Sequence, residues 1–184
     1  HHAIRRSRLR KTIAWSGMTG VSAALLAQQD FVGPADFLDY SERWDTSALV
    51  AGLGELGASA ILKTYFKHYA VCRWAHAAVD GVLELKHRHR LRVDEIETID
   101  VETFWEVTRL ANEAPSNTIA AQFSIQFALA VALLYDRIGP AEVSDAHIRD
   151  PAILGLARKI RVAVDDTLDR QFPAKTMAPV TIRM

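Results

Sequence analysis

Residues 118–135 read Thr-Ile-Ala-Ala-Gln-Phe-Ser-Ile-Gln-Phe-Ala-Leu-Ala-Val-Ala-Leu-Leu-Tyr and are apolar on almost every side of an ideal helix. A helix that is apolar all round is buried, whereas a surface helix keeps a polar face. The most apolar part, residues 123–135, is too short for a bilayer, which needs about 20 residues. The stretch therefore predicts one central helix in a protein core, where Gln122 and Gln126 need polar partners.

Short segments of strand character flank this helix along the chain. Residues 95–104, 160–164 and 180–182 alternate between apolar and polar side chains, as half-buried strands do. Residues 150–159 begin with Asp-Pro and predict a short helix, because proline suits a first helical turn. Strands separated by helices in mixed order predict an α+β fold, with a small mixed or antiparallel sheet packed with helices.

The N-terminal part of the sequence is predicted to be mostly helical. Residues 3–29 form a predicted helix with a basic start, and residues 47–56 form a second one. Residues 61–69 are rich in aromatic and alternating side chains and predict a strand. The chain begins His1-His2 without methionine, which is typical of a tag remnant. We therefore interpret residues 3–184 as a single domain.

Composition excludes several classes of site. The chain has 184 residues, 22 basic and 22 acidic side chains, and one cysteine. A balanced charge gives no general attraction to nucleic acid or to an anionic membrane. One cysteine cannot form an internal disulfide and supplies too few thiolates for a cysteine-rich metal site. A reducing, cytoplasmic setting fits this composition best.

Residues 67–80 carry a concentration of chemically active side chains that could bind an anion and move protons. They are Lys67, Cys72, Arg73, His76 and Asp80. The pattern from residue 73 to residue 88 is helical, with an apolar stripe that predicts a buried face. On an ideal wheel His76 and Asp80 lie on a different stripe, away from that core contact. Asp80 follows His76 by four residues and is expected to hydrogen-bond the imidazole.

Less specific interpretations of these residues remain open. Lys67 could cap a strand end, Cys72 could be a small buried hydrophobe, and His76 with Asp80 could be a surface pair worth about 0.3 to 0.5 kcal/mol. The basic runs at residues 5–11 and 86–92 could bind nucleic acid, but solvated faces often carry such runs. His87 and His89 diverge by about 200° on a helix, which argues against a shared metal ion.

The motif Lys67-x-Tyr69-x-x-Cys72-Arg73-x-x-His76-x-x-x-Asp80 resembles the signature of the MmgE/PrpD family. This family includes 2-methylcitrate dehydratase, cis-aconitate decarboxylase and iminodisuccinate epimerase. Three further stretches are similar to family segments in order and spacing: residues 24–34, 115–133 and 150–162. Two positions depart from the pattern, because the family often has proline at Ala70 and some members have histidine at Cys72.

The resemblance implies a cofactor-independent enzyme that acts on small di- or tricarboxylates, most closely a 2-methylcitrate dehydratase-like hydro-lyase. Family members are longer, and the resemblance implies that this sequence is the α+β lid domain of a homodimeric two-domain enzyme, inactive without its helical domain. A non-catalytic binding or dimerisation module, an epimerase and a decarboxylase are the alternatives.

The resemblance also assigns roles to residues of the cluster. It implies that Lys67 and His76 are catalytic and that Asp80 orients His76. Arg73 is a further candidate for binding a substrate carboxylate, and Cys72 is a candidate substrate contact. From its place in the predicted helix, Gln122 is either a structural residue or another substrate contact. The resemblance implies no metal ion and no organic cofactor, and the balanced charge and the short apolar stretch predict no nucleic acid and no membrane as partners. Because no cofactor would supply charge, side-chain cations have to neutralise the substrate carboxylates.

Overall fold

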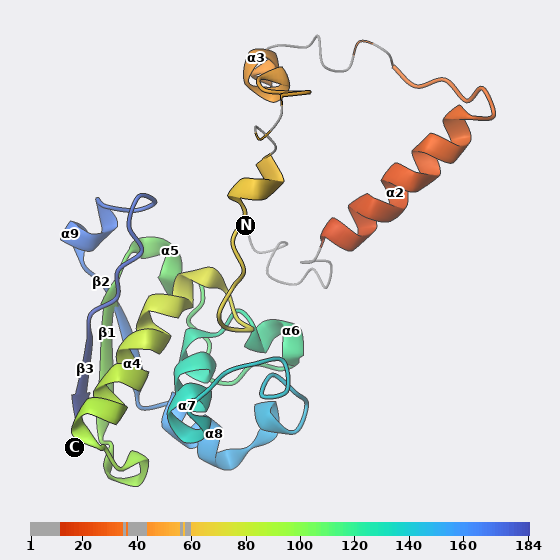
Figure 1. The fold of residues 1–184 in the computed structure, drawn as a ribbon. Helices are drawn as coiled ribbons and strands as arrows, with labels where there is room; N and C mark the ends of the chain where they lie inside the picture. The colour runs from red at the N-terminus through yellow and green to blue at the C-terminus, as the bar shows by residue number, and fades with distance from the viewer. Residues whose placement is uncertain (1–11, 35, 37–43, 56, 58–59) are drawn as a thin grey trace. The chain divides into compact units, whose positions relative to one another are not determined.

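The structure is a computed structural model that describes residues 12–34, 36, 44–55, 57 and 60–184. The chain divides into two compact units, an N-terminal unit of residues 1–66 and a C-terminal unit of residues 67–184. Each unit is described by itself below. Figure 1 shows the helices and strands of both units, with the residues outside the described ranges in grey.

The N-terminal unit contains three described helical segments. They are α2 (Thr12–Ala27), α3 (Thr46–Val50) and the 3₁₀ turn η2 (Ala60–Lys63). The helix predicted for residues 3–29 is confirmed over α2, and its basic start lies outside the described residues. The helix predicted for residues 47–56 is confirmed only over α3, after which the chain turns through Gly52 and Gly54, both with positive φ.

The strand predicted for residues 61–69 is wrong. Residues 60–63 form η2, and the Thr64 hydroxyl donates to the Ile61 carbonyl, which closes the turn. The alternating side chains that suggested a strand remain exposed, with Phe66 at 97 %. A strand is stabilised by pairing with a neighbouring strand, and none of the three described strands pairs with this segment.

The C-terminal unit is built on a three-stranded mixed sheet in the order β2-β1-β3. Strand β1 (Thr98–Thr103) pairs in parallel with β2 (Ile160–Val164) and antiparallel with β3 (Val180–Arg183). Val101 is the register partner of both Val162 and Val180. The sheet confirms the predicted α+β fold and the three predicted strand positions.

Helix α4 (His76–His89) packs on this sheet beside β3 (Figure 1). Its apolar stripe of Ala78, Val79 and Val82 is fully buried, as the spacing predicts. A side chain at Gly81 would bring a Cβ to 3.0 Å from the Val180 side chain, so glycine permits the close approach of helix and strand. The helix ends at Arg90, in the left-handed region with φ 51°, after a last turn rich in cations that suit its dipole.

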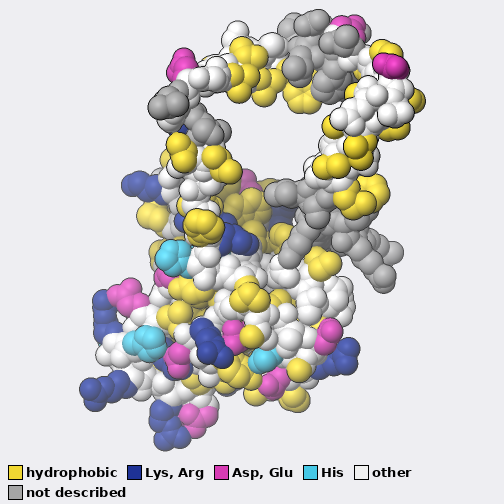
Figure 2. Space-filling view, turned by 45° about the vertical axis from the view of Figure 1, so that its right-hand side comes forward, with side chains coloured by type: hydrophobic (Ala, Val, Ile, Leu, Met, Phe, Trp, Pro, Cys, Tyr) yellow, Lys and Arg dark blue, Asp and Glu magenta, His cyan; other side chains and the backbone are white. Residues whose placement is uncertain are grey.

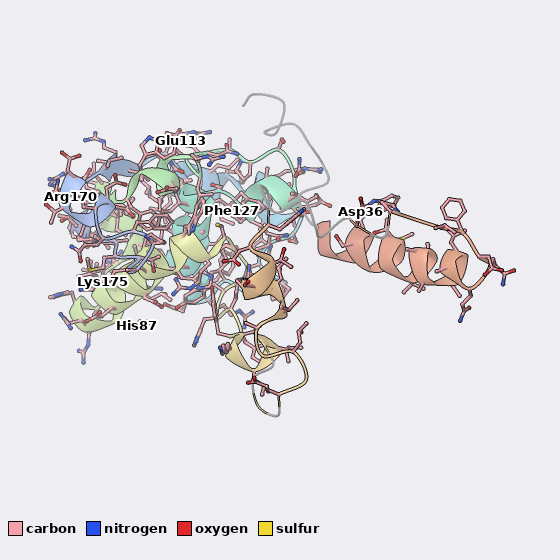
Figure 3. All side chains as sticks on the ribbon, turned by 90° about the horizontal axis from the view of Figure 1, so that it is seen from above. Asp36, His87, Glu113, Phe127, Arg170 and Lys175 are labelled. Atoms are coloured by element: carbon pink, nitrogen blue, oxygen red, sulfur yellow. The ribbon has the colours of Figure 1, made fainter. Side chains whose placement is uncertain are left out.

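Helix α7 (Ile125–Tyr135) is the centre of the core and packs against both α4 and α8 (Pro151–Ala157). Every residue from 125 to 133 is buried, and Figure 3 shows Phe127 deep among the side chains of the unit. The central helix predicted for residues 118–135 is therefore confirmed in its position and burial. Its continuity is wrong, because a break at residues 122–124 separates α7 from the short α6 (Thr118–Ala121).

Ser124 produces this break. Its backbone is extended, its hydroxyl oxygen accepts from Phe127 N at 3.0 Å, and the hydroxyl donates to the Asn112 carbonyl. This is the geometry of a serine N-cap, which begins a new helix. Gln126 finds the polar partner that its burial requires, because its Oε1 accepts from Asn112 N at 2.9 Å.

The remaining short elements connect these layers. They are η3 (Arg73–Ala75), η4 (Val93–Glu95), α5 (Trp105–Thr108), η5 (His147–Arg149) and α9 (Asp166–Asp169). Helix α8 begins at Pro151 after the Asp150 cap, as predicted, and ends at Ala157, before the predicted Lys159. Among the described residues, no helix combines the length and apolar character needed to cross a membrane.

Candidate functional site

The candidate site lies where the chain enters α4. Main-chain hydrogen bonds hold the entering segment of residues 70–72 on both sides: Ala70 N donates to Ile138 O at 3.0 Å, and Cys72 N donates to Gln122 O at 2.7 Å. The break between α6 and α7 leaves the Gln122 carbonyl available for this contact. The entering segment is therefore fixed by the core helices rather than by its own secondary structure.

Lys67 and His76 meet on one oxygen atom. Lys67 Nζ donates to the Val71 carbonyl at 2.9 Å, and His76 Nε2 lies 3.4 Å from the same oxygen. The lysine approaches from the loop before Val71, and the histidine is the first residue of α4. The structure thus brings together the two side chains that the family resemblance predicts as catalytic.

The position of His76 differs from the expectation drawn from the helical wheel. The ring is buried, at 5 % exposure, although it lies away from the apolar stripe of α4. Tyr69 covers it: the two rings meet edge to face with centroids 5.0 Å apart. The wheel considered only contacts of the helix with the core, whereas the loop that precedes the helix folds back and buries this face.

The environment of His76 disfavours its charged form. Burial is the largest cause and lowers the pKa of the imidazole below its ordinary value; the Val71 carbonyl opposes this shift, the cations of Arg73 and Lys67 add to it, and Asp80 has the smallest, opposing effect. The start of a helix also disfavours a cation. Because a carbonyl only accepts, Nε2 carries the proton of the neutral ring and Nδ1 carries the lone pair. His76 therefore has the form that a general base requires near neutral pH.

Asp80 contacts the site through Tyr69. The predicted hydrogen bond from Asp80 to the imidazole is replaced by one from the Tyr69 hydroxyl to Asp80 Oδ1, at 2.5 Å. Burial, with the hydrogen bond and charge of Asp80, raises the pKa of Tyr69 to about 12. Sequence reasoning assigned no role to Tyr69. Helical periodicity could not reveal this contact, because Tyr69 lies outside the helix.

The other predicted contact residues surround this pair. Arg73 is exposed and begins η3, and its charge reaches His76. Cys72 is a half-buried free thiol directly before it. Gln122 is half-buried and is joined to Cys72 through the main chain, so the structure brings these two residues together although they are 50 positions apart.

The side chains of this cluster are of the types that can bind an anion and accept a proton. Two cations and a neutral imidazole converge at Lys67, Arg73 and His76, and the single nearby carboxylate that acts on His76 is held by a phenol. Within the described ranges, no three His, Cys, Asp or Glu residues are grouped closely enough to hold a metal ion. Away from the site, acidic and basic side chains are interspersed over the face of the C-terminal unit that Figure 2 shows.

A comparison with protein families identifies the family of this chain. The model of the MmgE/PrpD C-terminal domain matches residues 69–184, which is more than half of the chain. The match begins just after Lys67 and includes Tyr69, His76, Asp80 and Gln122. A search of curated proteins found no match.

Proposed function

Because the chain belongs to the MmgE/PrpD family, we propose that the cluster around Lys67 and His76 is part of an active site for proton chemistry beside a carboxylate of a small di- or tricarboxylate. The family membership confirms the resemblance found in the sequence motif. The reaction that we propose is that of a 2-methylcitrate dehydratase-like hydro-lyase.

The observation that carries this proposal is the shared contact of Lys67 Nζ and His76 Nε2 with the Val71 carbonyl. Both nitrogens are directed at one oxygen acceptor. A carboxylate oxygen is a stronger acceptor for a lysine ammonium than a neutral carbonyl, because the hydrogen bond is then charged on both sides. A substrate carboxylate can therefore replace Val71 at Lys67 Nζ, while His76 Nε2 stays on the Val71 carbonyl and Nδ1 remains the basic nitrogen of the ring.

Each residue then has a defined role. Lys67 neutralises the carboxylate and the negative charge that develops on it when the neighbouring carbon loses a proton. His76, neutral because it is buried beside two cations, accepts that proton at Nδ1. In dehydration the hydroxyl group on the next carbon leaves as water after protonation. Such proton transfer typically contributes 10²- to 10⁴-fold to the rate.

The substrate also needs contacts for its remaining carboxylates. Arg73 is the nearest further cation, and Cys72 with Gln122 lines the same entry to α4. Lys67, Arg73 and Asp80 are all exposed, so one side of the cluster is open in the C-terminal unit. We assign the opposite side of the site to the helical domain that the family resemblance predicts, within a homodimeric protein.

Binding and turnover measurements test this function. We expect citrate and 2-methylcitrate to bind the 184-residue chain more tightly than acetate, and Lys67→Ala to weaken this binding at least about tenfold, the size of a charged hydrogen bond. Lys175→Ala is the matched control, because Lys175 is an exposed lysine of the same unit outside the cluster. Calorimetry measures both affinities. Turnover of 2-methylcitrate, citrate, cis-aconitate and iminodisuccinate is expected only when the helical domain is supplied.

Three outcomes would change the assignment. Robust turnover by the chain alone would contradict a shared site. Equal affinities for Lys67→Ala, His76→Ala and the unchanged chain would contradict the choice of residues. Binding without turnover of any of these substrates, even with the helical domain supplied, would indicate a binding module instead of an enzyme.

A further inference from the structure

Tyr69 joins the entry loop to α4 at two points. Its hydroxyl donates to Asp80 Oδ1 at 2.5 Å, and its ring covers the imidazole of His76 at a centroid distance of 5.0 Å. Asp80 and His76 lie one helical turn apart on α4, so this single side chain spans both. The contact also fixes the start of the loop that carries Val71, the residue on which Lys67 and His76 meet.

Without the Tyr69 hydroxyl, the Asp80 carboxylate could contact the His76 imidazole directly. Side chains four residues apart on a helix are neighbours, and a carboxylate beside an imidazole favours the charged ring. A phenol donates one hydrogen bond and is uncharged, so it occupies the carboxylate without adding charge. Burial, followed by the hydrogen bond and charge of Asp80, raises the pKa of Tyr69 to about 12, so the phenol stays protonated and remains a donor near neutral pH.

Charged groups act on His76 from the entry loop, from η3 and from α4, and the titratable ring of His68 lies beside Tyr69 at a centroid distance of 6.4 Å. Lys67 in the loop and Arg73 in η3 oppose protonation of the ring, and Asp80 on α4 favours it. Residues 118–126, which pack on Cys72, contain no titratable side chain. The segment that packs on Ala70 carries Arg137 and Glu142, which bind each other at 2.8 Å. Asp80 is therefore the carboxylate that acts on His76, and with Tyr69 in place its effect on the pKa of the ring is the smallest of the causes.

We propose, on the basis of the proton chemistry assigned above, that Tyr69 is a positioning residue that holds the Asp80 carboxylate away from His76 and so keeps the imidazole available as a base. The role is distinct from catalysis, because Tyr69 acts through Asp80 and through the orientation of the ring. The proposal concerns the unliganded site and needs no substrate to be tested.

The experiment is an NMR titration of His76 in the full 184-residue chain and in variants. Tyr69→Phe keeps the ring and removes the hydroxyl, so Asp80 is released and the pKa of His76 is expected to rise by about one unit, the lower range for an opposite charge at contact distance. In the double variant Tyr69→Phe with Asp80→Asn, this rise is expected to disappear. A rise in the double variant, or none in Tyr69→Phe, would overturn the proposal.

The chain contains a matched control for the tyrosine. Tyr135 also donates to a carboxylate, Asp150 Oδ2 at 3.3 Å, and also meets a histidine ring edge to face, His147 at 5.1 Å. Tyr135→Phe is expected to leave the pKa of His76 unchanged, and a comparable rise there would overturn the proposal.

Asp80→Asn provides a second measurement that leaves the tyrosine intact. Because Tyr69 already holds the carboxylate, this change is expected to lower the pKa of His76 by less than Tyr69→Phe raises it. A larger lowering would show that Asp80 acts directly on His76 in the unchanged protein. All these titrations are independent of ligand, so a failure of citrate binding would contradict the proposed function without altering their outcome.

Discussion

The two units of the chain use apolar residues in opposite ways. In the C-terminal unit, the apolar helix α7 is enclosed, and residues 125–133 are all buried. In the N-terminal unit, the apolar helix α2 exposes Trp15, Met18 and Leu25, each by more than half. No side chain described in the N-terminal unit is buried.

The burial of an apolar helix depends on the elements that pack against it. Neither helix carries a charged side chain, so neither sequence says which surface will cover it. Helix α7 has α4 and α8 against it, and the sheet lies beyond α4. Because apolar contact contributes to stability only when water is removed, the same type of side chain should differ greatly in its effect between the two units.

The largest expected difference in stability is between alanine substitutions of two phenylalanines, one in each unit. Phe127→Ala removes a side chain that is 0 % exposed, and it is expected to lower the free energy of unfolding by about 3 to 5 kcal/mol. Phe66→Ala makes the same chemical change where the side chain is 97 % exposed, and a change within about 0.5 kcal/mol is expected. Urea unfolding followed by circular dichroism measures both. Similar decreases in the free energy of unfolding for the two variants would contradict this difference between the units.

A smaller effect is expected from the helix caps. Ser124 caps α7 by accepting from Phe127 N and donating to Asn112 O, so Ser124→Ala is expected to cost about 1 to 2 kcal/mol in unfolding of the C-terminal unit. Asp45 caps α3 by accepting from Ala48 N at 2.9 Å, in a helix without buried residues. Asp45→Ala is expected to change the same transition by less than about 0.5 kcal/mol. The same denaturation curves give both values, and an equal cost for the two caps would contradict the contrast.

The smallest expected effect is a pH dependence of the folding stability. It compares a buried and an exposed histidine of the same helix, α4. Because burial lowers the pKa of His76 in the folded state, the unfolded chain binds its proton first as pH falls below about 6.5. Stability is therefore complete above that pH and decreases on acidification toward the lower folded pKa. We expect His76→Gln to reduce the loss of stability between pH 7.5 and 5.5.

His89→Gln is the control for this measurement, because His89 is the exposed last residue of the same helix. It is expected to leave the pH dependence as it is in the unchanged protein. Urea midpoints at the two pH values decide the matter. If His76→Gln loses as much stability on acidification as the unchanged chain, the imidazole is not held neutral by its surroundings.

The periodicity of apolar residues was sufficient to predict the elements that bury one regular face. Strands β1, β2 and β3 were predicted from alternation, and α4 from its apolar stripe, because their buried faces repeat at the period of the element. The central position of α7 was predicted because its residues are apolar on nearly all sides of the helix.

Features that depend on distant contacts could not be predicted in this way. The break before α7 depends on Ser124 reaching the Asn112 carbonyl, and the cover over His76 depends on a loop residue, Tyr69. The strand predicted for residues 61–69 had suitable side chains but no partner strand among the described residues. Grouping Lys67 with His76 came from the motif, whereas their shared contact with Val71 required coordinates.

In the proposed site, the Val71 carbonyl favours anionic ligands over neutral ones. Any ligand that binds Lys67 and His76 competes with an acceptor belonging to the protein itself, present at the high effective concentration of an intramolecular group. A neutral oxygen of an alcohol or amide gains little over this internal competitor, whereas an anionic oxygen gains the charge interaction. Under the proposed function, discrimination between carboxylates and neutral molecules would begin in the resting state, before any contact specific to one substrate is made.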